Sequence, residues 1–265
     1  MSWILAVETS TEWCSVALGR ATPTGGLHCL ARHEQTGPRS SARVLPAAGE
    51  LLAEAGIRLA DCAAIAFGAG PGSFTGLRTA CGIAQGLAFG ADLPVVPVNT
   101  LMACAERVRG VPGAGLEGEG DPAADVLPPG MPVLVALDAR MDEVYAGLFD
   151  WDAVRGEWQE AGPMRVIPPE AVPKPAAPFW LAGNSVTVYG ERLQVAAQAA
   201  RTISGAMPHA AAVVAIAQRA LARGETVAAA DAAPLYLRDK VAQTVAERQA
   251  AAAGRASLAA TGERQ

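Results

Sequence analysis

The chain has 265 residues, of which 51% are hydrophobic, and a formal net charge of −5. A chain of this length buries roughly 70–75% of its unfolded surface, which is enough for one large domain or two small ones. The acidic balance argues against a protein that binds nucleic acid alone, because phosphate contacts need a surplus of Lys and Arg on one face. If RNA is involved, we expect a partner to hold most of it.

Five cysteines, an odd number, are scattered without a C-x-x-C pair, which is typical of a protein from a reducing compartment. The N-terminus lacks the basic residues of an export signal, and the sequence has no uninterrupted apolar stretch of about 18 residues. We therefore expect a cytoplasmic protein that is neither exported nor inserted in a membrane.

The first hundred residues alternate between apolar segments and turn residues. Strands are predicted at residues 2–7, 14–18, 27–33, 63–67 and 95–98, and helices at residues 41–55 and 75–89. The first three strands should form an antiparallel meander, after which helices and strands alternate. Ser40 or Ser41 is placed to cap the first helix. This order indicates a ribonuclease-H-like α/β lobe at residues 1–103.

The second half of the chain predicts a smaller α/β lobe at residues 104–240. Its strands are expected at residues 133–137, 144–149 and 179–182, and a helix at residues 210–223. The helix around residues 208–224 is free to pack back on the first lobe. Residues 110–132 predict a surface loop, the proline-rich residues 163–178 an irregular or edge-like segment, and residues 241–265 a flexible tail.

The most informative motif is the run from Gly68 to Arg78, GAGPGSFTGLR, which links a predicted strand to a predicted helix. Backbone N–H groups at such a junction can hold an anion. The run lacks the lysine of a P-loop and the G-x-G-x-x-G spacing of a dinucleotide site. Two hypotheses stay open. Gly70, Gly72 and Ser73 bind phosphate, or the glycines allow positive φ and close packing while Ser73 caps the helix.

A turn of one acidic and three hydroxyl residues, Glu8-Thr9-Ser10-Thr11, ends the first predicted strand. Its carboxylate and hydroxyls can face a metal-bound phosphate. The alternative is that Thr9 and Ser10 cap the turn while Glu8 is solvated. The turn is similar to the one that opens the actin, hexokinase and Hsp70 superfamily, in which aspartate usually takes the acidic position.

Three glycines, Gly82, Gly86 and Gly90, recur at every fourth position along the second predicted helix. Each interior glycine costs roughly 1 kcal/mol relative to alanine, so an unusually close helix contact is the expected compensation. Either the chain's own sheet or a helix of another subunit can make that contact.

Other catalytic chemistry finds little support in the sequence. His28, His33 and His209 are not spaced as metal ligands on one helical face, no G-x-S-x-G elbow occurs, and no cysteine has a histidine placed to activate it. The charged turn at residues 138–143 is best explained as a local salt-bridged cap. We predict no catalytic residue and no metal site.

Four short segments of the sequence occur in a fixed order. They are Leu5-Ala6-Val7-Glu8-Thr9-Ser10, the run from Gly68 to Arg78, Asp138-Ala139-Arg140 with Glu143-Val144-Tyr145, and Pro234-Leu235-Tyr236-Leu237-Arg238. Together they resemble the bacterial TsaB family, also called YeaZ, from the start of the chain to about Arg238. The resemblance implies two ribonuclease-H-like lobes of the actin-like (ASKHA) superfamily.

The resemblance also implies a role. Members of this family join TsaD and TsaE in making N6-threonylcarbamoyladenosine next to the anticodon of tRNA. TsaD carries the metal and transfers the threonylcarbamoyl group, TsaE supplies a P-loop ATPase, and the TsaB member dimerises with TsaD. The resemblance implies that this chain binds no cofactor by itself and that ATP and metal bind to its partner subunits. It implies that tRNA contacts this chain only through the complex, and that the chain alone is free to form a homodimer.

The same resemblance implies that the helices at residues 41–55 and 75–89 pair with their counterparts in TsaD. The contact residues carried over are Val44, Leu45, Leu51, Leu52, Leu77, Arg78, Cys81, Gly82, Gln85 and Gly86. The sequence differs from catalytic relatives at two places. Residues 39–43 contain no histidine, whereas the catalytic relative places metal-binding histidines on the corresponding helix. Residues 181–185 form only a short counterpart of the glycine-rich adenosine motif of ATP-binding relatives. We therefore expect only a vestigial nucleotide site, formed by Glu8, Thr9, Ser10, Gly70, Gly72 and Ser73.

Two other functions remain as alternatives. An actin-like nucleotide-binding enzyme, an ATPase or phosphotransferase, would use Glu8 and Thr9 near a metal and residues 70–73 for phosphate. A relative of the M22-type peptidases would need a nucleophile or a metal that the sequence does not offer.

Overall fold

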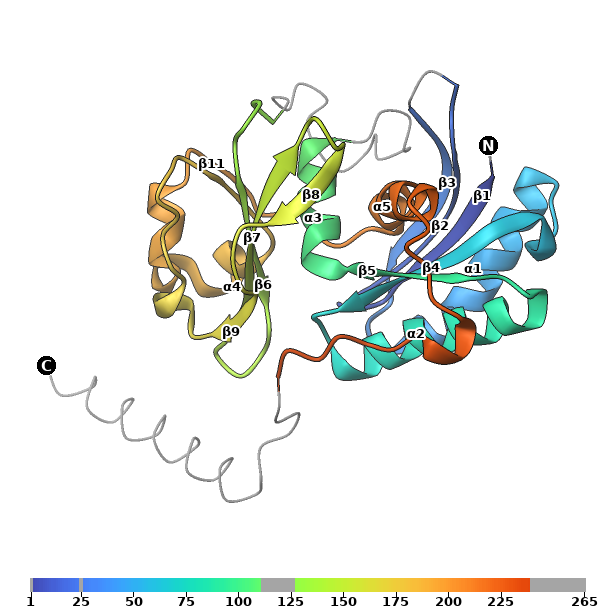
Figure 1. Ribbon diagram of the computed structural model, residues 1–265. Helices are drawn as coiled ribbons and strands as arrows, with labels where there is room; N and C mark the ends of the chain where they lie inside the picture. The colour runs from blue at the N-terminus through green and yellow to red at the C-terminus, as the bar shows by residue number, and fades with distance from the viewer. Residues whose placement is uncertain (1, 24–25, 111–126, 239–265) are drawn as a thin grey trace, which may run out of the picture.

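The computed structural model describes residues 2–23, 26–110 and 127–238. The tail predicted at residues 241–265 and most of the loop predicted at residues 110–132 lie outside these ranges. The described residues form two lobes, each built on one mixed sheet (Figure 1). The strand orders are β3-β2-β1-β4-β5 and β11-β10-β6-β7-β8, with β9 paired to β7. Two α/β lobes are the predicted fold class.

The first sheet contains the predicted meander. Its strands are β1 (Trp3–Glu8), β2 (Trp13–Ala21), β3 (Leu27–Gln35), β4 (Cys62–Gly70) and β5 (Val95–Asn99), and its helices are α1 (Ser40–Ala55), α2 (Phe74–Ala91), α3 (Thr100–Arg109) and α5 (Ala210–Ala222). β1, β2 and β3 pair antiparallel, whereas β4 and β5 extend the sheet in parallel with β1. The strands and helices predicted for residues 2–98 are confirmed.

Alternation along β1 decides which helices cover which face of this sheet. Leu5 and Val7 pack in one apolar cluster with α1 and α2, whereas Ile4 and Ala6 pack in another with α5. Figure 1 shows α2 and α5 on opposite sides of the sheet. Both faces are therefore covered, and α1 and α2 lie together on one of them.

The second sheet is built from shorter elements. Its strands are β6 (Val133–Asp138), β7 (Val144–Asp152), β8 (Glu157–Glu160), β9 (Arg165–Ile167), β10 (Trp180–Ala182) and β11 (Arg201–Ile203), and α4 (Ser185–Tyr189) follows β10. Short 3-10 turns occur at Gly37–Arg39, Leu59–Asp61, Pro169–Ala171, Gly190–Arg192, Gln194–Gln198 and Ala229–Asp231. Within the proline-rich segment, β9 is an edge strand that pairs only with β7.

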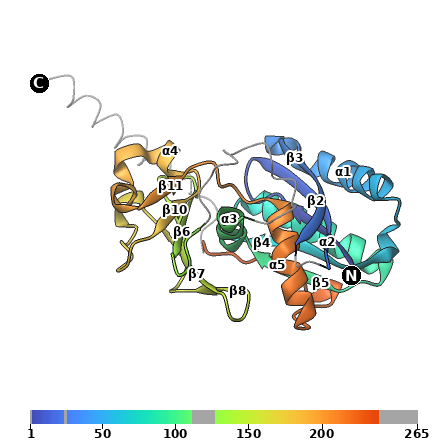
Figure 2. The same cartoon turned by 90° about the horizontal axis from the view of Figure 1, so that it is seen from above.

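Helix α3 joins the lobes and was not predicted. Asn99 caps it, because its side-chain oxygen accepts bonds from the N–H groups of Leu101 (2.9 Å) and Met102 (3.2 Å). Ala103 packs in the first-lobe cluster with α5, and Leu101 packs with β6 residues of the second lobe. Figure 2 shows α3 between the two sheets. The predicted boundary at residues 103 and 104 falls inside this helix.

The start of α1 differs from the prediction. The residue in the N-cap position is Arg39, which makes no capping bond, and Ser40 instead donates to the carbonyl of Gly37 at 2.9 Å. The prediction that Ser40 or Ser41 caps α1 is therefore wrong. The reason is the 3-10 turn before the helix, which engages the Ser40 hydroxyl. Ser73 is the N-cap residue of α2, but its side chain forms no capping bond.

Candidate functional site

The segments that carry the sequence resemblance converge on one cleft between the lobes. The cleft has a volume of about 580 Å³ and is lined by residues 9–12, 72–77, 138–141 and 235–238, together with the start of α1. The first two segments belong to the first lobe and the third to the second lobe. The site can be built from their contacts.

Glu8, at the end of β1, is buried rather than solvated. It is 1% exposed, one carboxyl oxygen accepts the N–H of Ser10 at 2.5 Å, and the other has no hydrogen-bond partner among the described residues. Burial raises the pKa of Glu8, and the hydrogen bond from the Ser10 N–H only partly opposes this. The idea that Glu8 is a solvated turn residue is wrong, because the β4 backbone at Gly68 packs directly against its carboxyl group.

The glycine loop touches the Glu8-Thr9-Ser10 turn directly. The N–H of Ser73 donates to the carbonyl of Ser10 at 2.7 Å, and the Thr9 hydroxyl donates to the carbonyl of Gly76 at 2.7 Å. A Cβ at Gly76 would lie 1.9 Å from the Thr9 carbonyl oxygen, and one at Gly72 would lie 2.5 Å from the Ser10 Cβ. The glycines here permit close packing of the loop on the turn.

The C-terminal segment lies against the other side of the glycine loop. The N–H of Leu235 donates to the carbonyl of Ala69 at 2.7 Å. Gly70 has φ +130°, and a Cβ there would lie 2.3 Å from the carbonyl oxygen of Leu235. A side chain at this position is therefore excluded both by conformation and by space. These contacts explain why two sequence segments so far apart contribute to one site.

The turn between β6 and β7 forms the second-lobe wall of the cleft. Three successive residues, Arg140, Met141 and Asp142, have positive φ angles of 61°, 57° and 59°. Arg140 pairs with Asp138 at 3.2 Å, so the predicted salt-bridged turn is confirmed. Tyr145 donates from its hydroxyl to the carbonyl of Gly72 at 3.2 Å, which ties this wall to the glycine loop.

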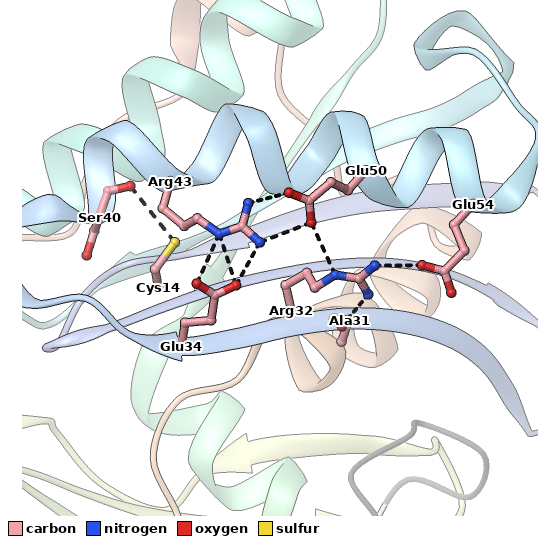
Figure 3. Close-up of polar contacts among 8 residues, drawn as sticks. All are labelled: Cys14, Ala31, Arg32, Glu34, Ser40, Arg43, Glu50 and Glu54. Carbon is pink, nitrogen blue, oxygen red and sulfur yellow. Dashed lines mark hydrogen bonds and ion pairs between the residues drawn. The ribbon is translucent and has the colours of Figure 1, made fainter.

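At the start of α1, arginines and glutamates form an ion-pair network (Figure 3). Arg43 bonds Glu34 on β3 at 2.7 Å and Glu50 on α1 at 2.6 Å, while Arg32 bonds Glu50 and Glu54. Hydrogen bonds from Arg43 hold the pKa of Glu34 below its usual range. The network fastens α1 to the edge strand β3 in the region where catalytic relatives are expected to place metal-binding histidines.

The remaining candidate groups do not assemble into a metal site. Within residues 2–23, 26–110 and 127–238, no three or more His, Cys, Asp and Glu side chains are arranged to hold an ion. The sequence did not predict that His33 and His209 lie together, with ring centroids 4.4 Å apart. Burial lowers the pKa of His209, whose Nδ1 accepts the N–H of Ala211 and caps α5. The side chain of this histidine is therefore neutral and acts as the N-cap of α5.

The ten interface residues that the resemblance implied fall into a buried group and a more exposed group. Val44, Leu51, Leu77 and Cys81 are at most 5% exposed and belong to the apolar core, so these four cannot contact a partner as the helices lie here. Of the other six, Leu52 and Gln85 are half-buried, and Leu45, Arg78, Gly82 and Gly86 are exposed. The core members hold the helices against the sheet.

The exposed members lie on an open face of α1 and α2. Cβ atoms built at Gly82, Gly86 and Gly90 meet nothing within 4 Å, so these glycines do not pack against the chain's own sheet. Leu45 is 51% exposed, and Phe89, which the sequence analysis did not select, is 83% exposed. Its position seven residues after Gly82 places it on the same helical face. We call the surface of Leu45, Gly82, Gly86, Phe89 and Gly90 the docking face.

Two α/β lobes around a cleft, with a turn from each lobe facing it, define a protein of the actin-like class. The family model described as TsaD, tRNA N6-adenosine threonylcarbamoyltransferase, matches residues 32–246. YeaZ from Pseudomonas aeruginosa is 40% identical in its solved structure, with a TM-score of 0.73 over 89% of this chain and 100% of that chain.

Two curated relatives carry the name tRNA threonylcarbamoyladenosine biosynthesis protein TsaB. The one from Haemophilus influenzae is 36% identical over 249 residues, 90% of this chain and 94% of the relative. The one from Escherichia coli is 36% identical over 245 residues, 90% of this chain and 96% of the relative. The chain belongs to the TsaB (YeaZ) family. The family resemblance and the two-lobed, actin-like fold predicted from the sequence are confirmed.

None of the helices in the described ranges is both long enough and apolar enough to cross a bilayer.

Proposed function

We propose that this chain is a non-catalytic subunit in the synthesis of tRNA N6-threonylcarbamoyladenosine, and that it dimerises with and activates the TsaD transferase. The relatives' names support the pathway, and the docking face supports the mode of action. The single observation that carries the proposal is this face: an added Cβ at any of three glycines of α2 would meet nothing within 4 Å in the described part of the chain, and Leu45 of α1 and Phe89 of α2 are exposed.

Glycine on a helix surface lets a second helix approach closely, which offsets the cost of glycine within the helix. Leu45 on α1 and Phe89 on α2 supply exposed apolar area. A stable partner interface buries about 1,200–2,000 Å² in total, which two helices from each subunit can provide. Because the family model named for TsaD also matches this chain, the partner has related helices to offer.

The proposal leaves ATP and metal to TsaD and TsaE, and tRNA reaches this chain through the complex. Glu8 supports this division of roles, because its carboxyl group is buried against the β4 backbone at Gly68. The glycine loop supports it as well, since Gly72 and Gly76 pack tightly on the turn at Thr9 and Ser10 and so join the loop to β1. In the absence of TsaD, the docking face can pair with a second copy of itself.

Gly86→Leu tests the proposal. The leucine projects from the docking face into open space, so the isolated chain should fold normally while TsaD is held away. Co-purification with tagged TsaD should be lost, and circular dichroism of the variant should match that of the parent.

Two variants control this experiment. Gly86→Ala adds little bulk and should keep most of the binding. Gly205→Leu adds the same bulk at an exposed turn after β11 in the second lobe, where an added Cβ meets nothing within 4 Å, and should bind TsaD fully. Normal co-purification and full tRNA modification by Gly86→Leu would reject the docking face as the contact.

A further inference from the structure

An aromatic and arginine cluster stands at the mouth of the cleft. The ring centroids of Phe74 and Tyr236 are 5.3 Å apart, and the Arg78 guanidinium carbon lies 4.5 Å from the Phe74 ring centroid. Tyr236 is 44% exposed, and both rings line the cleft. Phe74 and Arg78 come from the start of α2, and Tyr236 comes from the C-terminal segment. We call these three residues the stacking cluster.

Two helix N-termini and two arginines lie near this cluster, although the whole chain is acidic. α1 and α2 both begin at the cleft, and neither has an acidic residue in its first turn or a side-chain cap. Arg39 precedes α1 and Arg78 lies in the second turn of α2, and neither forms a salt bridge within the described part of the chain. Two helix N-termini and two arginines with no carboxylate partner favour a bound anion.

A buried hydroxyl gives an independent sign of a ligand. Ser10 is 2% exposed and lines the cleft, and its Oγ has no hydrogen-bond partner among the described residues. A buried polar group in this state favours a donor or acceptor from beyond the described residues, such as a bound ligand. Asp138 and Glu12 also line the cleft, and Asp138 is paired with Arg140.

We propose that the cleft mouth binds single-stranded RNA, with one or two unpaired bases stacked on the stacking cluster and a phosphate held by the helix N-termini. Exposed aromatic rings and arginine planes are how proteins hold unstacked bases, and RNA loops present such bases. The inference rests on the proposed function, which brings tRNA to the complex. It adds a direct contact between this chain and tRNA, whereas the acidic composition predicted only contact through a partner.

Photo-crosslinking tests this contact. p-Azidophenylalanine replaces Tyr236, and a labelled, unmodified tRNA transcript that reads a codon beginning with A is irradiated with the chain, with and without TsaD. A ribonuclease-sensitive adduct should form at position 236. The same group at Val154, 97% exposed on the second lobe, should form none.

The outcomes separate this inference from the scaffold role. An adduct that forms equally without TsaD supports the RNA site and counts against the need for a partner. Adducts to protein alone, or none at position 236 in either setting, overturn the RNA site even where the TsaD complex forms.

A pair of substitutions tests stacking as the cause. Tyr236→Ala should weaken tRNA binding by the TsaD complex about tenfold or more. Tyr236→Phe keeps the ring and should bind like the parent. Unchanged binding by the alanine variant, or an equal loss in the phenylalanine variant, would overturn base stacking.

Discussion

Glu8 ends β1 with a carboxyl group that is almost completely shielded from solvent. Its position after the first strand suits a metal-bound phosphate in an actin-like protein, yet its oxygens face the Ser10 N–H and the β4 backbone at Gly68. Gly76 packs against Thr9 in the same way, at a distance that excludes any side chain. At this scale, residues typical of a nucleotide site serve to join β1, β4 and the glycine loop.

The raised pKa of Glu8 makes a prediction about pH. Above the ordinary pKa of 4.5, the unfolded chain releases this proton while the folded chain keeps it, so the free energy of unfolding falls as pH rises. The fall ends once the folded-state pKa is passed. Glu8→Gln carries no such proton, so its stability relative to the parent should rise with pH, by about 1 kcal/mol per pH unit within this window.

Urea denaturation between pH 4 and pH 8 measures the effect. Glu191→Gln, at an exposed position in the second lobe, is the control and should follow the parent. Parallel curves for Glu8→Gln and the parent would show that Glu8 is ionised in the folded protein.

At the scale of elements, α3 ties the lobes together through one buried carboxylate. Glu106 is fully buried and accepts bonds from Arg219 on α5 at 2.7 Å, Arg109 at 2.8 Å and the Trp158 indole on β8 at 2.7 Å. Burial alone would raise the pKa of Glu106, but Arg219 and Arg109 outweigh it and lower the pKa. First-lobe and second-lobe elements therefore share one ionic centre.

Glu106→Ala should destabilise the chain by about 3 kcal/mol, because it leaves two partly buried arginines and an indole N–H without their acceptor. Chemical denaturation of the isolated protein measures the loss. Glu170→Ala removes the exposed partner of Arg192 and should change stability little. Similar small losses in both variants would mean that the Glu106 centre does not hold the lobes together.

The sequence predicted elements well where one face of an element is apolar. α1 and α2 have such faces, and β1 to β5 are bounded by clear turn residues. α3 was missed because its buried residues include the polar Thr100 and Glu106, so the buried side of the helix is not a simple apolar stripe in the sequence. β9 and β11 have three residues each, and their pairing depends on distant partners rather than local preference.

The site could be predicted only in part for a similar reason. The motifs at Glu8, Gly70 and Tyr236 are visible in the sequence, but their meeting depends on contacts between distant segments. The orientation of α2 about its own axis on the sheet decides which of its side chains are buried. Leu77 and Cys81 are buried in this orientation, and Phe89 is exposed. A resemblance transfers residues by position, whereas their orientation toward core or solvent is decided by packing.

On the scale of the whole molecule, we assign different roles to two surfaces. The docking face lies on α1 and α2 of the first lobe, and added Cβ atoms at its glycines would meet nothing within 4 Å among the described residues. The cleft lies between the lobes and is bordered by the starts of the same two helices. A partner seated on the docking face would therefore lie close to the cleft mouth, where we place RNA.

Reconstitution of tRNA modification tests the central claim most directly. TsaD and TsaE from the same organism are mixed with tRNA, ATP and a threonylcarbamoyl donor, with or without this chain, and N6-threonylcarbamoyladenosine is measured after digestion. The account predicts modification only when this chain and TsaD are both present, and no ATP consumption by this chain alone. Modified tRNA or sustained ATP turnover from the purified chain alone would contradict it and favour a nucleotide-dependent enzyme.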